Sequence, residues 1–178
     1  MVDEAITPDM SGFRAPFGGT DDSSEDLFDP EDEFVPEHLP DIGPLLADHD
    51  VLTGEDHVDV HRMTTEVFEE RGVYDVTFGY NLARLNLDTR HPDAGYRYAE
   101  KRDDPSVLCA VFTPTTAFCP QGETLTKASF RAWNGLSERH EYELVKVRVD
   151  PMHQRSGEVN QVLEEWESRY LESGTVTW

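Results

Sequence analysis

The residue with the most chemical potential is Cys119, which lies between a short apolar segment and an amphipathic one. Residues 107–112 form an apolar run of strand length, and residues 120–136 repeat apolar side chains at steps of three and four, which predicts a helix. Pro120 suits the first helical position, so Cys119 is expected at or beside the N-cap. A thiol there faces unpaired backbone N–H groups and the positive end of the helix dipole, which favour thiolate. A buried free cysteine that closes a turn fits the same pattern.

Polar residues near this thiol add to the candidate site. Thr113, Thr115 and Thr116 could donate hydrogen bonds to a thiolate, although threonines before a helix usually serve turn geometry. Three histidines at the ends of predicted elements could approach the thiol, or could be ordinary polar residues at those ends: His91, His140 and His153.

Other patterns offer less chemistry. His57 and His61 stand four apart on a predicted helix and could clasp a divalent metal, but no third ligand is evident and surface histidines are the preferred interpretation. Trp133 and Trp166 lie on apolar helical faces and are expected in the core. The sequence contains no pattern typical of a Ser-His-Asp catalytic triad, no phosphate-binding glycine loop and no dinucleotide-binding motif.

Charge excludes one class of partner. The 178 residues include 37 Asp and Glu against 15 Lys and Arg, a formal charge of -22, so nucleic acid is not expected to bind. Residues 1–56 hold 17 acidic residues and one basic residue. With only three lysines, the composition resembles that of proteins from concentrated salt; folding that is normal without molar salt would contradict this hypothesis about habitat.

Cysteine usage predicts a reducing compartment, and hydropathy predicts no membrane association. Two cysteines in a chain of this size do not describe a disulfide scaffold, so both are expected to be reduced and the protein cytoplasmic. No apolar run reaches 18 residues, and the first residues are acidic where a signal peptide needs a basic region, so no membrane association is expected.

Two regions are predicted along the chain. Residues 1–56, rich in Asp, Glu, Pro and Gly, are expected to form a mostly disordered acidic tail. Apolar residues in this tail could dock on the folded domain or on a partner, although a solvated tail is preferred: Phe28, Phe34, Val35, Leu39, Ile42, Leu45 and Leu46. Residues 57–178 are expected to form one folded domain.

The periodicity of residues 57–178 predicts a two-layer α+β domain, in which a three-stranded sheet packs against three to four helices. Helices are predicted at 57–71, 74–87, 120–136 and 157–170, and the second of these segments also has strand character. Strands are predicted at 95–101, 107–112 and 142–149, the first two as an antiparallel hairpin.

The order of strand, Thr-Pro-Thr, Cys, helix, strand, Pro-x-His and helix resembles the iron–sulfur assembly domain family. This family includes bacterial PaaD-like and SufT-like proteins and the eukaryotic cytosolic iron–sulfur assembly component 2 proteins. The similarity covers residues 80–165 and is carried by residues 112–115, Cys119, Leu125, Leu136, Glu138, Arg139, Val147, Val149, Pro151, His153, Val159, Asn160 and Leu163. Where the family usually has Asp-Pro-Glu, this chain has Asp88-Thr89-Arg90, followed by His91-Pro92 as in one branch.

The resemblance implies a non-enzymatic factor that assembles iron–sulfur clusters or delivers them to client apoproteins, with Cys119 as the metal-facing thiol. His153 and His91 are candidate additional ligands, and Thr113, Thr115, Thr116 and Pro120 are expected to shape the site. Clusters normally take four protein ligands, so a homodimer, a second ligand of this chain or the assembly machinery would have to complete the shell around a transient cluster or iron.

Two other hypotheses stay open at this point. The chain could be a protein–protein interaction module with a structural cysteine and no metal chemistry. It could also be a thiol enzyme in which Cys119 is the nucleophile and His140 or His153 the base.

Overall fold

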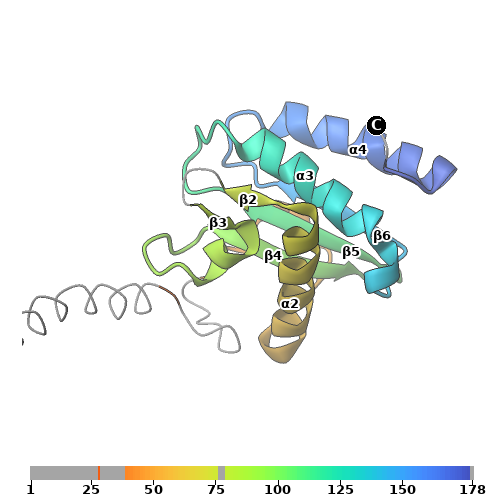
Figure 1. The fold of residues 1–178 in the computed structure, drawn as a ribbon, viewed down its shortest axis with the longest axis horizontal. Helices are drawn as coiled ribbons and strands as arrows, with labels where there is room; N and C mark the ends of the chain where they lie inside the picture. The colour runs from red at the N-terminus through yellow and green to blue at the C-terminus, as the bar shows by residue number, and fades with distance from the viewer. Residues whose placement is uncertain (1–27, 29–38, 76–78, 177–178) are drawn as a thin grey trace, which may run out of the picture.

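The computed structural model describes residue 28, residues 39–75 and residues 79–176, and Figure 1 shows their arrangement. The elements, in chain order, are η2 (Pro44–Leu46), β1 (Asp50–Val51), α2 (Gly54–Arg71), β2 (Tyr74–Asp75), β3 (Tyr80–Asn81), η3 (Leu82–Leu87), β4 (Gly95–Lys101), β5 (Asp104–Thr113), α3 (Gly122–Gly135), η4 (Ser137–Arg139), β6 (Leu144–Val149) and α4 (Ser156–Ser173), where η marks a 3-10 helix. The predicted α+β class is confirmed.

The main sheet has four strands in the order β1-β4-β5-β6, one strand more than predicted. β4 and β5 form the predicted antiparallel hairpin, and β6 runs parallel to β5 after the α3 connection. Gly95, at the start of β4, pairs with Thr113 at the end of β5, and Phe112 pairs with Val149 at the end of β6. The segments before β4, after β5 and after β6 therefore leave the same end of the sheet.

Three helices cover one face of the sheet, with α4 beside α3 (Figure 1). The core between them holds the alternate side chains of the strands, because successive residues of a strand point to opposite faces. Tyr96 and Tyr98 of β4 are fully buried there, and so is Trp133 of α3. Trp166 of α4 is 9 % exposed, so both tryptophans lie in the core as expected.

Residues 39–51 cover part of the opposite face. Leu46 is completely buried and packs against Ala99, Cys109 and Val111. β1 lies beside β4, with Val51 opposite Ala99. The predicted boundary at residue 56 is therefore corrected to a position upstream of it, because the apolar residues of this segment have a sheet face to bury. The remainder of the predicted tail, except residue 28, lies outside the described residues.

The segment 74–87 does not form the helix that its spacing favoured. It forms the short β2–β3 pair and then the 3-10 helix η3, and residues 76–78 lie outside the described part. Gly79 has φ of 75°, a left-handed conformation that suits the turn between the two strands. The Asn81 side chain accepts a hydrogen bond from the Ala83 N–H at 2.9 Å and thereby starts η3 as a separate element.

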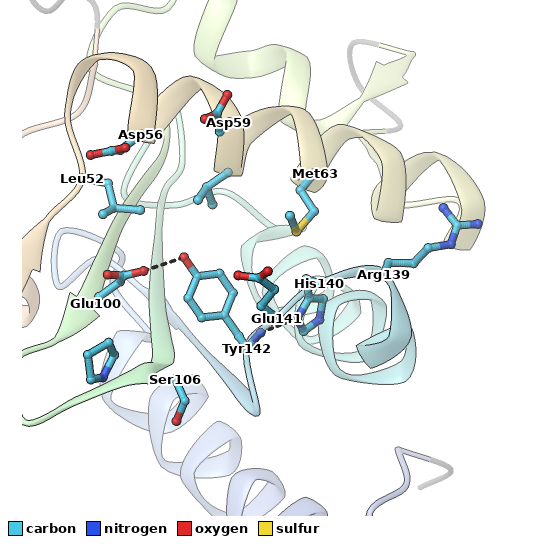
Figure 2. Close-up of a pocket in the computed structure, with 12 residues that line it drawn as sticks. Leu52, Asp56, Asp59, Met63, Glu100, Ser106, Arg139, His140, Glu141 and Tyr142 are labelled. Carbon is cyan, nitrogen blue, oxygen red and sulfur yellow. Dashed lines mark hydrogen bonds between the residues drawn. The ribbon is translucent and has the colours of Figure 1, made fainter.

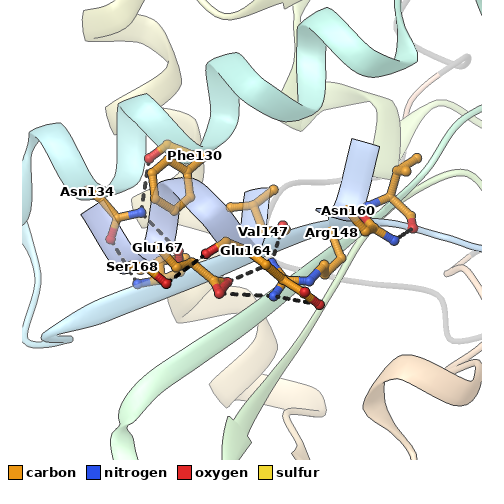
Figure 3. A network of polar contacts seen from close by, with 10 residues as sticks. Phe130, Asn134, Val147, Arg148, Asn160, Glu164, Glu167 and Ser168 are labelled. Atoms are coloured by element: carbon orange, nitrogen blue, oxygen red, sulfur yellow. Dashed lines mark hydrogen bonds and ion pairs between the residues drawn. The ribbon is translucent and has the colours of Figure 1, made fainter. Parts of the chain in front are cut away.

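Asparagine side chains line the β6 edge of the main sheet (Figure 3). On β6, Asn134 of α3 pairs with the N–H and C=O of Val145, both at 2.9 Å, and Asn160 of α4 pairs with those of Val149 at 2.9 and 3.0 Å. Each amide takes the place of a neighbouring strand. The unpaired groups of an edge strand are satisfied in this way from the two covering helices.

On the other side of the sheet, the part of β4 that the two-residue strand β1 does not cover is satisfied in the same way. Asn86 of η3 accepts from the N–H of Tyr96 at 2.6 Å and donates to its carbonyl at 2.8 Å. Further along β4, the carbonyl of Tyr98 accepts from the N–H of Leu52 at 2.9 Å, and β1 pairs with the strand's last residues. Arg148 adds a bond on the β6 edge by donating to the carbonyl of Val147 at 2.9 Å, and it also pairs with Glu167 of α4 (Figure 3).

Candidate functional site

The Cys119 turn joins β5 to α3. The helix begins at Gly122 with Gln121 as its N-cap, so Pro120 does not occupy the predicted first helical position and Cys119 lies two residues before the cap. The N–H of Cys119 donates to Thr116 at 3.4 Å, and its carbonyl accepts from Gly122 at 3.2 Å. These bonds close a turn of their own. The helix dipole acts mainly on the first turn, so its effect on the thiol is smaller than the sequence suggested.

His153 holds this turn in place. Its Nε2 donates to the carbonyl of Cys119 at 3.0 Å, its Nδ1 accepts from the N–H of Arg155 at 3.1 Å, and its side chain is buried. The N–H of Gln154 donates to the carbonyl of Ala117 at 2.9 Å. The structure thus places His153, one of the three candidate histidines, against the Cys119 turn. The histidine contacts the backbone of the turn, and both ring nitrogens are engaged.

Gly122 makes the close approach of His153 possible. A Cβ at Gly122 would lie 2.8 Å from Nε2 of His153. We expect Gly122→Ala to displace the imidazole and to lower the free energy of unfolding by about 1–2 kcal/mol in urea titrations. Gly157→Ala in the first turn of α4 is the matched control, because a Cβ there meets nothing within 4 Å. That variant should be neutral or more stable by about 0.5–1 kcal/mol; equal losses in both would contradict the explanation.

The other predicted site residues lie at the same end of the sheet. Thr113 ends β5, Thr115 is half-buried in the turn that follows, and Thr116 is exposed and uses its carbonyl to bind the Cys119 N–H. His91 lies in the turn before β4, where its N–H donates to the Asp88 carbonyl at 3.1 Å. Within the described residues, no group of three or more His, Cys, Asp or Glu side chains is placed to hold a metal ion.

Two exposed apolar side chains beside Cys119 were missed by sequence reasoning. Phe118 is 71 % exposed and Met152 is 40 % exposed. Their turns are joined by the bonds from His153 and Gln154 described above. The sequence feature that could have identified Phe118 is an aromatic residue inside an otherwise polar turn. Cys119 itself is half-buried, whereas Cys109 lies on β5 and is buried, which raises the pKa of its thiol.

The two other histidine hypotheses are corrected. His140 precedes β6, whereas Cys119 follows β5; because these strands are parallel, the two residues lie at opposite ends of the sheet. His140 Nε2 donates to the Trp133 carbonyl at 2.7 Å and Nδ1 accepts from the Tyr142 N–H at 3.2 Å, so it cannot serve Cys119 as a base.

His57 and His61 are buried and not on the surface. The Nε2–H of His61 donates to the Ala83 carbonyl and the Tyr98 hydroxyl donates to Nδ1, both at 2.7 Å, so His61 has no lone pair left for a metal. The rings of His57 and His61 stack with centroids 5.8 Å apart. Burial, with the nearby charges of His61 and Arg97, lowers the pKa of His57 to about 3. Burial lowers the pKa of His61 to about 4 despite its bond to Ala83.

A groove of about 790 Å³ lies between α2, the β4–β5 hairpin and the segment before β6 (Figure 2). Its lining includes apolar side chains, among them Leu52, Val60 and Met63, and one arginine, Arg139, which pairs with Glu70 at 2.8 Å. Four acidic side chains also line it: Asp56, Asp59, Glu100 and Glu141. Tyr142 projects between them and donates to Glu100 at 2.8 Å. Burial and this bond raise the pKa of the Tyr142 hydroxyl, so it stays protonated at neutral pH. The four carboxylates suit a positively charged ligand. The spacing of residues along the sequence could not have predicted this groove, because its lining comes from segments far apart in the chain.

Comparisons with known proteins identify one family. A family described as Domain of unknown function (DUF7998) matches residues 26–177. No curated protein and no solved structure matches the chain. Among the helices of the described residues, none has the length and apolar composition that crossing a membrane requires.

Proposed function

Because the chain belongs to the DUF7998 family, whose description assigns no activity, its role must be inferred from its own residues, and we propose that it assists iron–sulfur cluster assembly or delivery through Cys119. The observation that carries this proposal is the partly accessible thiol in a turn held by His153. Thiolate is the ligand that iron–sulfur clusters prefer. The proposed role is carriage by contact between proteins, without turnover of a small substrate.

The order of elements supports the proposal. β5, the Cys119 turn, α3, β6, the Pro151–His153 segment and α4 follow one another as in the family that the sequence resembles. The exposed Phe118 and Met152 offer apolar contact area next to the thiol, which a client apoprotein or assembly component would need. The cluster or iron would be cargo, because the described residues hold no complete ligand shell and both nitrogens of His153 are used. A client, the assembly machinery or a second copy would supply the remaining ligands.

Anaerobic purification with iron and sulfide analysis tests the proposal. We expect the wild-type chain to carry iron and sulfide, and Cys119→Ser to lose nearly all of both while keeping its fold. Cys109→Ala is the matched control, because that cysteine is buried away from the turn, and it should retain the wild-type iron content. Equal iron in the wild type and in Cys119→Ser would remove Cys119 from the mechanism.

A second candidate function is an interaction module without metal chemistry, and the acid-lined groove favours it (Figure 2). A basic segment of a partner could place its cations at the carboxylates and its aliphatic stems against Leu52, Val60 and Met63. Wild-type protein free of iron, together with slow alkylation of both cysteines, would favour this function. Alkylation of Cys119 much faster than that of Cys109 would favour the thiol-based role.

A further inference from the structure

Asp88 organises a polar cluster at the end of η3. Its side chain is fully buried and accepts hydrogen bonds from the Tyr80 hydroxyl at 2.7 Å and from Nε and Nη2 of Arg90 at 2.9 and 2.8 Å. Burial alone would raise the pKa of Asp88, but the bonds from Arg90 and Tyr80 outweigh it and lower the pKa. Asp88 is therefore ionised at neutral pH and fixes both partners in one arrangement.

Phe28 lies against this cluster although it is 60 residues away in the chain. Its backbone forms an antiparallel bridge with Asp88. Its ring meets the ring of Tyr80 edge-on, with centroids 5.6 Å apart, and the guanidinium carbon of Arg84 lies 3.9 Å above its centroid. The guanidinium of Arg90 is 5.9 Å away. A phenylalanine with one cation over its face and an aromatic edge beside it is a specific arrangement.

Charge complements this geometry. The carboxylate of Asp88 pairs with Arg90, whereas Arg84 forms no ion pair with any carboxylate of the described residues and covers Phe28. In the sequence Glu25, Asp26 and Asp29 flank Phe28. Phe28, which the sequence places among acidic residues, thus meets a surface that presents two arginines and a tyrosine.

We propose that Tyr80, Arg84, Asp88 and Arg90 form a docking site for an acid-flanked phenylalanine, and that its occupant is the segment of this same chain centred on Phe28. The site anchors the acidic N-terminal residues at a defined place on the domain. It does not depend on the role proposed for Cys119. A partner with a similar motif could enter only by displacing this segment.

A labelled peptide with the sequence of residues 22–33 tests the site by fluorescence anisotropy. We expect full-length Phe28→Ala, whose site is vacated, to bind the peptide at least tenfold more tightly than the wild type. The same peptide with alanine at position 28 should bind neither protein. Adding Arg84→Glu to Phe28→Ala should weaken binding about tenfold or more, whereas adding Arg62→Glu on α2 should not. Equal binding to the wild type and to Phe28→Ala would overturn the proposal.

A second measurement does not depend on Phe28→Ala folding normally. In the otherwise wild-type chain, Arg84→Glu should speed chymotrypsin cleavage after Phe28 several-fold relative to Arg62→Glu. Unchanged cleavage would contradict docking. A wild-type dimer that becomes monomeric in Phe28→Ala would show that Phe28 occupies the site of a second copy, and would overturn the intramolecular assignment.

Discussion

A shift from pH 7.5 to pH 5 is expected to lower the free energy of unfolding by about 4 kcal/mol, a large share of the stability of an ordinary domain. His57 and His61 are the cause. In the folded chain their pKa values are lowered to about 3 and about 4, so both stay neutral over this range. In the unfolded chain they bind protons below about pH 6.5.

The direction of this pH dependence follows from the pKa values of the two histidines in the folded and unfolded chain. The unfolded state binds more protons than the folded state as the pH falls below 6.5, so the stabilisation is complete above that pH and declines towards pH 4. Each histidine contributes a slope of about 1.4 kcal/mol per pH unit in this window. The stacked imidazoles cannot both be protonated without placing two positive charges inside the core.

Urea unfolding at several pH values between 7.5 and 5 checks this prediction. His57→Phe keeps an aromatic ring beside Tyr98 and removes one titrating group, so the slope should fall by about half. Val67→Ala in the core of the same helix is the control, because it should lower the free energy equally at every pH. A wild-type slope near zero between pH 6.5 and pH 5 would contradict the assignment of both histidines as neutral.

Replacement of Asn134 by alanine is expected to lower the free energy of unfolding by about 3 kcal/mol. Its amide binds the N–H and C=O of Val145, which is completely buried, so alanine leaves both backbone groups without a partner and without access to water. Each orphaned group costs about 1–3 kcal/mol. The variant should also expose the edge of β6.

Asn160→Ala provides the matched comparison. Asn160 makes the same pair of bonds to Val149, which is as completely buried as Val145, but Asn160 itself is half-buried whereas Asn134 is 3 % exposed. Water can therefore enter beside Val149 and replace part of what is lost. We expect a loss of about 1 kcal/mol in the same urea titrations. Equal losses for the two asparagines would mean that burial does not determine the effect.

Local periodicity predicted correctly those elements in which the apolar spacing, the residue types and the end signals all favoured the same structure. The α2 helix ends at Arg71, as predicted, with Gly72 as its C-cap at φ of 70°. The β4–β5 hairpin and the α4 helix lie close to their predicted bounds. Periodicity failed at 74–87, where helical spacing and strand-forming residues were both present. There Gly79 and the Asn81 cap decided the conformation, and neither contributes to an apolar repeat.

The candidate site was only partly predictable. The family resemblance offered His153 as a candidate neighbour of Cys119, and the parallel pairing of β5 and β6, which the sequence did not predict, puts the two turns at one end of the sheet. It could not show that the imidazole binds a carbonyl rather than approaching the sulfur. The burial of His57 and His61 and the contact between Phe28 and Arg84 depend on contacts between distant segments, which spacing along the chain does not report.

The asparagines that line the sheet have a consequence for assembly. A sheet grows into fibres, or accepts a donated strand, through backbone groups that are free to bond along its rim. Here the N–H and C=O groups of Tyr96, Val145 and Val149 already bond to amides held by η3, α3 and α4. Recruitment of a foreign strand would first require a covering helix to release its asparagine, so fibre growth through these rims should be slow even in a crowded solution.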